Sequence, residues 1–160
     1  MAKKVHENQY FNVTLNDKGY LRIYQKTGGA VVIPTVGDSY ILIEHQRGDE
    51  VLLEFPRGFL EQGESHAVGG LRELKEELNL DGVAVQVLGE LRTDSGLIQD
   101  NIAAVQCTVI GTRGITLQHS EGVLSWRLMP LPALMRAVKA GEIKDNFTLA
   151  ALMLLLAQNA

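Results

Sequence analysis

The chain has 160 residues, 46% hydrophobic and 21% charged, which is the composition of a folded globular protein and excludes a disordered one. Its formal net charge of -4 argues against a broad basic surface, so no nucleic-acid partner is expected. The single cysteine, Cys107, favours a reducing and therefore cytoplasmic location, and no apolar run is long enough to cross a membrane.

The first part of the chain is predicted to be rich in strands. Short β-branched or aromatic runs, separated by Gly, Pro and Asp, predict strands at 21–25, 30–33, 40–44 and 51–55. A helix is expected next, because Ser65 is a good N-cap, leucines recur with helical spacing, and Asn79 suits a left-handed C-cap. Strands at 83–91, 102–110 and 123–128 and helices at about 132–140 and 147–158 complete the chain. This order predicts one mixed α/β domain over residues 1–160, with helices covering a sheet.

Three carboxylates in the predicted helix are the most informative feature. Glu73, Glu76 and Glu77 are spaced i, i+3 and i+4, so they share one helix face. Like charges this close repel one another, which is unfavourable unless a cation binds among them. A hard divalent cation with oxygen ligands is the natural candidate. The alternative is a solvated acidic helix face, but that would not explain the regular spacing of the residues before it.

The segment 58–80 resembles the Nudix box, in which a glycine, a glutamate and an Arg-Glu-rich run follow at fixed spacing. The matching positions are Gly58, Glu64, Arg72, Glu73, Leu74, Glu76, Glu77 and Leu80. One position departs, since Asn79 replaces a glycine that caps the helix, and Asn is the mildest replacement there. The resemblance implies a Nudix fold, a mixed β-sheet sandwiched between α-helices, with an N-terminal antiparallel sheet.

The resemblance also implies roles for the box residues. Glu73, Glu76 and Glu77 would bind Mg²⁺ or Mn²⁺, with Arg57 or Gly58 adding a backbone carbonyl. Glu64 belongs to the same group and, with Arg72, would orient the ligand helix by ion pairing. Glu76 and Arg72 are also expected to take part in catalysis, because a free carboxylate of the cluster can accept a proton. The implied reaction is attack of a metal-polarised water on a phosphorus of a nucleoside diphosphate linked to another group.

Segments outside the box resemble ADP-ribose pyrophosphatases. They are residues 30–33, 44–47, 54–58 and 141–145, with Thr148. This resemblance implies hydrolysis of ADP-ribose to AMP and ribose 5-phosphate. It also implies a homodimer formed through a β-extension of about residues 1–35. The proline that marks this branch is replaced by Ser95, which leaves another nucleoside diphosphate sugar open as the substrate.

In this branch the catalytic base is a glutamate on the loop before the last strand, which implies Glu121. An ordinary exposed loop glutamate is the alternative, and His119 is a second choice of base. Phe55 and Phe59 could stack on a nucleobase, but a core position is favoured for both. Substrate contacts are expected from groups suited to phosphate or sugar: Arg47, Arg57, Ser95, Gly96 and Asp100.

Two other functions stay open. A pyrophosphatase for nucleoside triphosphates or dinucleoside polyphosphates would use the same chemistry on another substrate. A nucleotide-sensing module would bind its ligand without hydrolysis, but such modules typically lose box carboxylates, and all the box glutamates are intact here.

Overall fold

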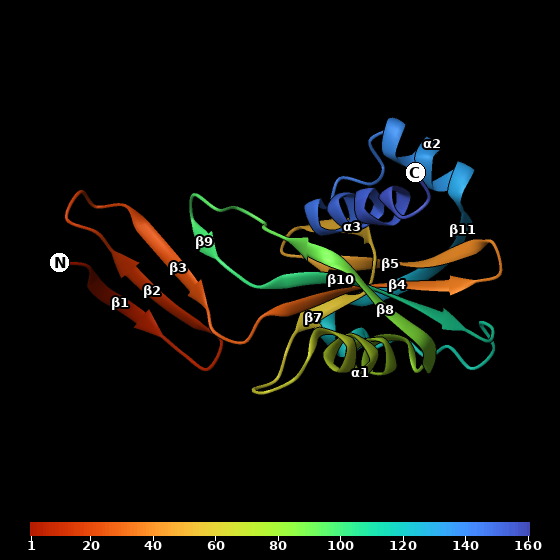
Figure 1. Cartoon of the computed structure of the whole chain (residues 1–160), viewed down its shortest axis with the longest axis horizontal. Helices are drawn as coiled ribbons and strands as arrows, with labels where there is room; N and C mark the ends of the chain where they lie inside the picture. Colours follow the sequence, from red (N-terminus) through yellow and green to blue (C-terminus); the bar gives the residue numbers. More distant parts are fainter.

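The computed structural model describes all 160 residues, and its body is a mixed sheet with helices on both faces (Figure 1). The strands run in the order β11-β5-β4-β10-β8, with β6 paired to β5 and β7 to β4. They are β4 (Gly29–Val36), β5 (Ser39–Arg47), β6 (Glu50–Glu54), β7 (Arg57–Phe59), β8 (Gly82–Leu91), β10 (Ile102–Val109) and β11 (Val123–Pro130). β4 and β10 are parallel and the other pairs are antiparallel, so the predicted mixed α/β architecture is confirmed.

Helix α1 (His66–Leu78) covers one face of the sheet, and α2 (Leu131–Lys139) and α3 (Asn146–Ala157) cover the other (Figure 1). Successive residues of a strand point to opposite faces. In β4, Val32 accordingly packs in the cluster that contains the leucines of α1, whereas Val31 and Ile33 pack in the cluster that contains those of α3. The core is therefore two apolar layers, one on each face of the sheet.

The ends of α1 lie where the sequence predicts them. The Ser65 hydroxyl accepts a hydrogen bond from the Val68 N–H at 3.2 Å, and Asn79 adopts the left-handed conformation with φ 57°. Two glycines inside the helix, Gly69 and Gly70, weaken its intrinsic propensity. They permit close packing, since a Cβ on Gly69 would lie 2.2 Å from a methyl group of Leu60. α2 and α3 begin and end one residue earlier than predicted.

A second sheet, which we call the N-terminal sheet, projects from the body (Figure 1). Its order is β1 (Lys3–Glu7), β2 (Phe11–Leu15), β3 (Leu21–Gln25) and β9 (Ile98–Gln99). β9 lies in a segment for which the sequence predicts only a loop, and its two residues are a strand because they pair with β3. None of residues 1–27 is buried, so this sheet has no core of its own. No helix of the chain combines the length and apolar character needed to cross a membrane.

Candidate active site

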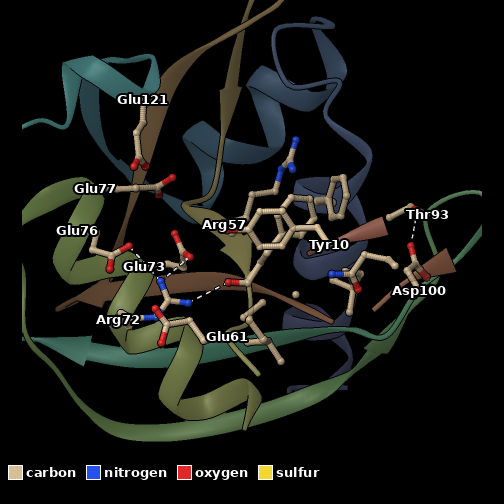
Figure 2. Close-up of a pocket in the computed structure, with 18 of the residues that line it drawn as sticks. Tyr10, Arg57, Glu61, Arg72, Glu73, Glu76, Glu77, Thr93, Asp100 and Glu121 are labelled. Atoms are coloured by element: carbon tan, nitrogen blue, oxygen red, sulfur yellow. Dashed lines mark hydrogen bonds and ion pairs between the residues drawn. The ribbon is translucent and has the colours of Figure 1, made fainter. Parts of the chain in front are cut away.

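A pocket of about 510 Å³ lies where α1, β7 and the N-terminal sheet meet. Figure 2 shows its arrangement: the glutamates of α1 and Glu121 lie on one side, the Tyr10 ring in the middle, and Thr93 and Asp100 on the other side. The volume falls within the range of small-molecule sites, roughly 300 to 1,000 Å³. Since it also collects most of the polar groups singled out from the sequence, this pocket is the candidate active site.

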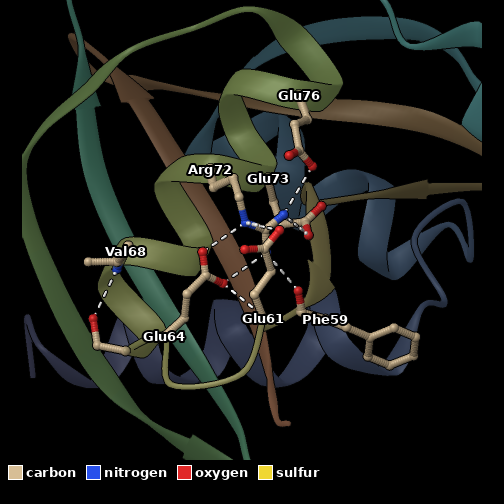
Figure 3. Close-up of polar contacts among 8 residues, drawn as sticks. Phe59, Glu61, Glu64, Val68, Arg72, Glu73 and Glu76 are labelled. Carbon is tan, nitrogen blue, oxygen red and sulfur yellow. Dashed lines mark hydrogen bonds and ion pairs between the residues drawn. The ribbon is translucent and has the colours of Figure 1, made fainter. Parts of the chain in front are cut away.

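Arg72 is the centre of the ionic contacts at the carboxylate side (Figure 3). Its Nε and Nη2 donate to the two carboxylate oxygens of Glu64 at 2.8 and 3.0 Å, a bidentate pair. Its Nη1 donates to Glu73 at 2.8 Å and to Glu76 at 3.0 Å. These carboxylates, Glu64 first, raise the pKa of Arg72, so its charge is permanent. Nη2 also donates to the Phe59 carbonyl at 2.9 Å, which fixes β7 against α1.

Glu73 lies directly against the backbone of Gly58. A Cβ on residue 58 would come within 2.1 Å of the carboxyl carbon of Glu73, so only glycine leaves space for this side chain. Glu73 is 8% exposed. Burial raises the pKa of Glu73, and the hydrogen bond from Arg72 opposes that rise. The glycine at the start of the box therefore has a direct steric purpose.

Glu77 has no cationic partner of this kind. Glu77 is 3% exposed, and its Oε2 is buried without a hydrogen-bond partner. Burial, followed by the charge of Glu73, raises the pKa of Glu77 to about 8. Glu121, at the end of the 3₁₀ turn His119–Glu121, also lines the pocket, on the same side as the glutamates of α1 (Figure 2). The Gln118 N–H donates to the Glu77 carbonyl at 3.1 Å, which ties this turn to α1. An ionised carboxylate in this position is costly unless a cation compensates it.

The carboxylate side has the chemistry of a divalent-cation site. Its donors are hard oxygens, which Mg²⁺ and similar ions prefer, and Glu77 Oε2 is a buried oxygen without a partner. As the side chains stand, no three His, Cys, Asp or Glu residues converge closely enough to enclose an ion. Arg72 holds Glu73 and Glu76 through hydrogen bonds, which accounts for this. The residues fit a divalent cation if Glu73 and Glu76 exchange their hydrogen bonds to Arg72 for bonds to the ion.

Two arginines of the pocket share one buried partner. Glu54 is fully buried, and its Oε1 lies 2.5 Å from Nη2 of Arg47 and 3.7 Å from Nε of Arg57. Arg57 Nη2 lies 3.8 Å from Asp145, and its guanidinium is 4.0 Å from the centre of the Phe147 ring. The Nε of Arg57 is buried and makes no hydrogen bond. Two guanidinium groups held in this way can bind an anion such as a diphosphate.

Aromatic rings form the middle of the pocket. The Tyr10 ring stacks on Phe59 with centroids 5.1 Å apart and 27° between planes, and Phe11 meets Phe59 edge-on at 5.4 Å. Phe59 is 41% exposed, so the core position predicted for it is wrong. It lies on β7 at the pocket, where the rings of Tyr10 and Phe11 pack against it. Phe55 is fully buried, and its predicted core position is confirmed.

Asp100 and Thr93 form the opposite side of the pocket. The Thr93 hydroxyl donates a short hydrogen bond to Oδ2 of Asp100. Oδ1 of Asp100 is buried without a partner, and the residue is 8% exposed. An unpartnered acceptor in a pocket wall is suited to a hydroxyl or amino group of a ligand, because its desolvation is otherwise uncompensated.

Most of the predicted site residues come together here. Those that line the pocket are Arg47, Arg57, Gly58, Arg72, Glu73, Glu76, Glu77, Asp100 and Glu121. Glu64 is outside the lining and acts through its pairing with the box arginine. Ser95 and Gly96 are exposed and do not line the pocket, and neither does His119. The roles given to all these residues stay predictions.

The sequence indicates no role for four residues that line the pocket, Tyr10, Phe11, His45 and Thr93. The same is true of Glu54, which is fully buried and pairs with Arg47. Glu54 could be found from the sequence, because a glutamate at the end of an apolar strand is expected to be buried, and a buried charge needs a partner. No local pattern identifies Tyr10, which reaches Phe59 only through the fold of the N-terminal sheet.

Comparison with known proteins identifies the class. Residues 25–150 match the NUDIX domain family, which spans most of the chain, so the chain belongs to the Nudix family. It is a Nudix pyrophosphatase, as the box resemblance implies, and Nudix hydrolases generally use divalent metal ions.

Among solved structures, the fold is similar to one described as an ADP compounds hydrolase, with a TM-score of 0.74 and 21% sequence identity. The alignment covers 99% of this chain and 91% of the other, so the similarity includes the N-terminal sheet. The predicted Nudix fold is thereby confirmed. No curated protein sequence matches the chain.

Proposed function

We propose that this enzyme hydrolyses the diphosphate bond of a nucleoside diphosphate sugar, with ADP-ribose as the leading substrate and Mg²⁺ or Mn²⁺ as cofactor. The products would be AMP and ribose 5-phosphate. One observation carries the proposal: carboxylates, two arginines and an aromatic cluster line the same pocket. A substrate with a diphosphate between a base and a sugar needs these three kinds of contact together.

The metal would be held by Glu73, Glu76 and Glu77. Glu77 supplies the buried oxygen without a partner, and Gly58 supplies the space for Glu73 and, through its carbonyl, a further oxygen. When bound, a divalent cation would neutralise diphosphate charge and lower the pKa of the attacking water. Glu64 and Arg72 support this arrangement, since their bidentate pair ties the loop before α1 to the ligand helix.

The protein's own groups would bind the diphosphate and move the proton. Arg47 and Arg57 line the pocket, and the buried Glu54 sets their orientation. They can therefore bind diphosphate oxygens with little further loss of side-chain conformational entropy. Glu121 lines the pocket from an exposed turn, on the same side as the glutamates of α1, and would accept the proton of the attacking water. His119 lies outside the pocket lining, which favours Glu121 as the base.

Substrate selection would lie in the middle and on the far side of the pocket. Phe59 and Tyr10 offer ring faces to a nucleobase, and the free Oδ1 of Asp100 offers an acceptor to a hydroxyl or amino group. The similar solved structure is described as acting on ADP compounds, which supports an adenine nucleotide. Ser95 and Gly96 contribute to substrate binding in this proposal only if their loop moves, because they do not line the pocket.

A substrate panel tests the proposal. ADP-ribose, other nucleoside diphosphate sugars, dinucleoside polyphosphates and nucleoside triphosphates are incubated with the enzyme, with Mg²⁺ or with excess chelator, and products are separated by chromatography. We expect AMP and ribose 5-phosphate from ADP-ribose, and no product in chelator. Pyrophosphate release from triphosphates, with ADP-ribose intact, would instead identify the alternative pyrophosphatase. Tight binding of ADP-ribose without turnover would identify a sensing module.

We also propose that the chain forms a homodimer through the N-terminal sheet. A sheet without a buried residue is marginal in water unless another surface covers it, and this one exposes Val5, Tyr20 and Leu21. A second copy would supply that surface and keep Tyr10 fixed over the pocket. Size-exclusion chromatography with light scattering should give twice the chain mass, and Tyr20→Glu should shift it toward the monomer. The cytoplasmic location stays a prediction.

A further inference from the structure

His45 is the only histidine that lines the pocket, and the proposed mechanism gives it no role. It lies on β5 and is 4% exposed. A histidine this well buried must have its ring nitrogens accounted for, because an unpaired polar atom in the interior is costly. Its contacts show what the ring does in this position.

The ring packs against the turn that carries Glu121. Val123 is the cross-strand partner of His45, and the Gln46 N–H donates to the Gly122 carbonyl at 2.8 Å. Gly122 has φ 96°, a left-handed conformation that favours glycine. A Cβ there would lie 3.1 Å from Cε1 of His45 and 3.1 Å from the Gln46 carbonyl oxygen. The imidazole therefore occupies the space beside the backbone of the residue that follows Glu121.

A hydrogen bond fixes the orientation of the ring. Nδ1 of His45 lies 2.9 Å from the Gln46 carbonyl oxygen, which can only accept, so Nδ1 carries the proton. Nε2 has no hydrogen-bond partner within the protein. Burial, followed by the charge of Arg47, lowers the pKa of His45, so the ring is neutral at neutral pH. A neutral ring can pack against the turn without adding a positive charge next to the residue that follows Glu121.

We propose that His45 is a positioning residue for Glu121: its ring, locked by the Nδ1 hydrogen bond, holds the turn 118–122 so that the Glu121 carboxylate faces the pocket on the same side as the glutamates of α1. This inference rests on the proposed role of Glu121 as base. It assigns His45 an effect on the chemical step rather than on substrate binding. A displacement of about 1 Å in a reacting group can cost on the order of a hundredfold in rate.

Three substitutions at position 45 separate the two ring nitrogens. His45→Asn keeps an N–H donor near the position of Nδ1, His45→Gln keeps a polar group near that of Nε2, and His45→Ala keeps neither. With ADP-ribose and Mg²⁺, we expect His45→Ala to lower kcat by about tenfold or more while KM stays within about twofold. We expect His45→Asn to recover most of the loss and His45→Gln to recover little. Recovery by His45→Gln alone would overturn the proposal, because it would assign the effect to Nε2.

A double substitution tests whether His45 acts through Glu121. Glu121→Gln alone tests the proposed base, and near-normal kcat there would refute that role separately from the present inference. If Glu121→Gln is impaired, we expect adding His45→Ala to change its residual kcat by less than about twofold. The same fold-loss in both backgrounds would show that His45 acts independently and would overturn the proposal. Circular dichroism verifies folding, and if His45→Ala does not fold, the Asn and Gln variants decide.

Discussion

Glu77→Gln should change how the stability of the metal-free protein depends on pH. Glu77 is 3% exposed, its Oε2 has no partner, and its pKa is raised to about 8, chiefly by burial. The metal-free folded protein therefore holds a neutral Glu77 at neutral pH, whereas the unfolded chain ionises it near pH 4.5. Glutamine has nearly the same shape and cannot ionise, so it removes this difference between the two states.

The sign and size follow from proton linkage. Below pH 4.5 the carboxyl is protonated in both states; between pH 4.5 and about 8 the folded state binds more protons, so the free energy of unfolding falls as pH rises. At about 1.4 kcal/mol for each pH unit, the loss attributable to Glu77 is roughly 3 to 5 kcal/mol by pH 8, and it levels off above that. Saturating Mg²⁺ should offset this loss, because a bound cation stabilises the ionised carboxylate in the folded state only.

Urea unfolding measured from pH 5 to pH 9 in chelator tests this expectation. The difference in the free energy of unfolding between wild type and Glu77→Gln should grow in favour of the variant as pH rises. The matched control is Glu76→Gln, a box glutamate whose side chain is 45% exposed and which should give nearly parallel curves. Parallel curves for Glu77→Gln as well would refute the reasoning, because Glu77 would then be ionised at no cost in the metal-free fold.

Three further predictions concern activity and local strain. In saturating Mg²⁺, Glu77→Gln should lower kcat for ADP-ribose at least about a hundredfold, since a metal ligand is lost; near-normal AMP release would contradict its role. Phe59→Ala should raise KM about tenfold or more with a smaller change in kcat, because base stacking contributes roughly 1 to 3 kcal/mol. The control is Tyr40→Phe, an aromatic residue that packs on the core outside the pocket, and an unchanged KM for Phe59→Ala would exclude stacking on Phe59. Ala84→Gly should raise the unfolding free energy by about 0.5 to 1 kcal/mol, because Ala84 has φ 51°; a lower melting temperature would contradict this.

Helix α1 and its carboxylates could be predicted from sequence because everything that determines them is local. Ser65 and Asn79 cap the helix as expected, and Glu73, Glu76 and Glu77 share a face through helical spacing alone. Gly58 lies outside the helix, but its fixed sequence spacing from Glu73 in the box corresponds to direct contact between the two residues in the structure. These features need only periodicity, capping chemistry and one resemblance.

The substrate side could not be predicted in the same way, because it is made by contacts between distant segments. Tyr10 and Phe59 are far apart in the chain, and nothing in either segment indicates that their rings stack. β9 has two residues, too few for any periodic pattern, and exists only through β3. The sequence predicts a core position for Phe59 because an aromatic residue beside apolar neighbours has the same pattern whether it is buried or lines a pocket.

The like-charge repulsion inferred from the sequence is only partly relieved by Arg72. One guanidinium serves Glu64, Glu73 and Glu76, which leaves the carboxylate side with excess negative charge, and Glu77 remains outside this group. Burial raises the pKa of both Glu73 and Glu77, and the pKa of about 8 for Glu77 means that a proton occupies its carboxyl group in the metal-free protein at neutral pH. A divalent cation and protons would then compete for the same oxygens, which requires metal affinity to rise with pH until Glu77 is fully ionised. Because Arg72 keeps its charge throughout, that pH dependence would come from the ligands and not from their supporting arginine.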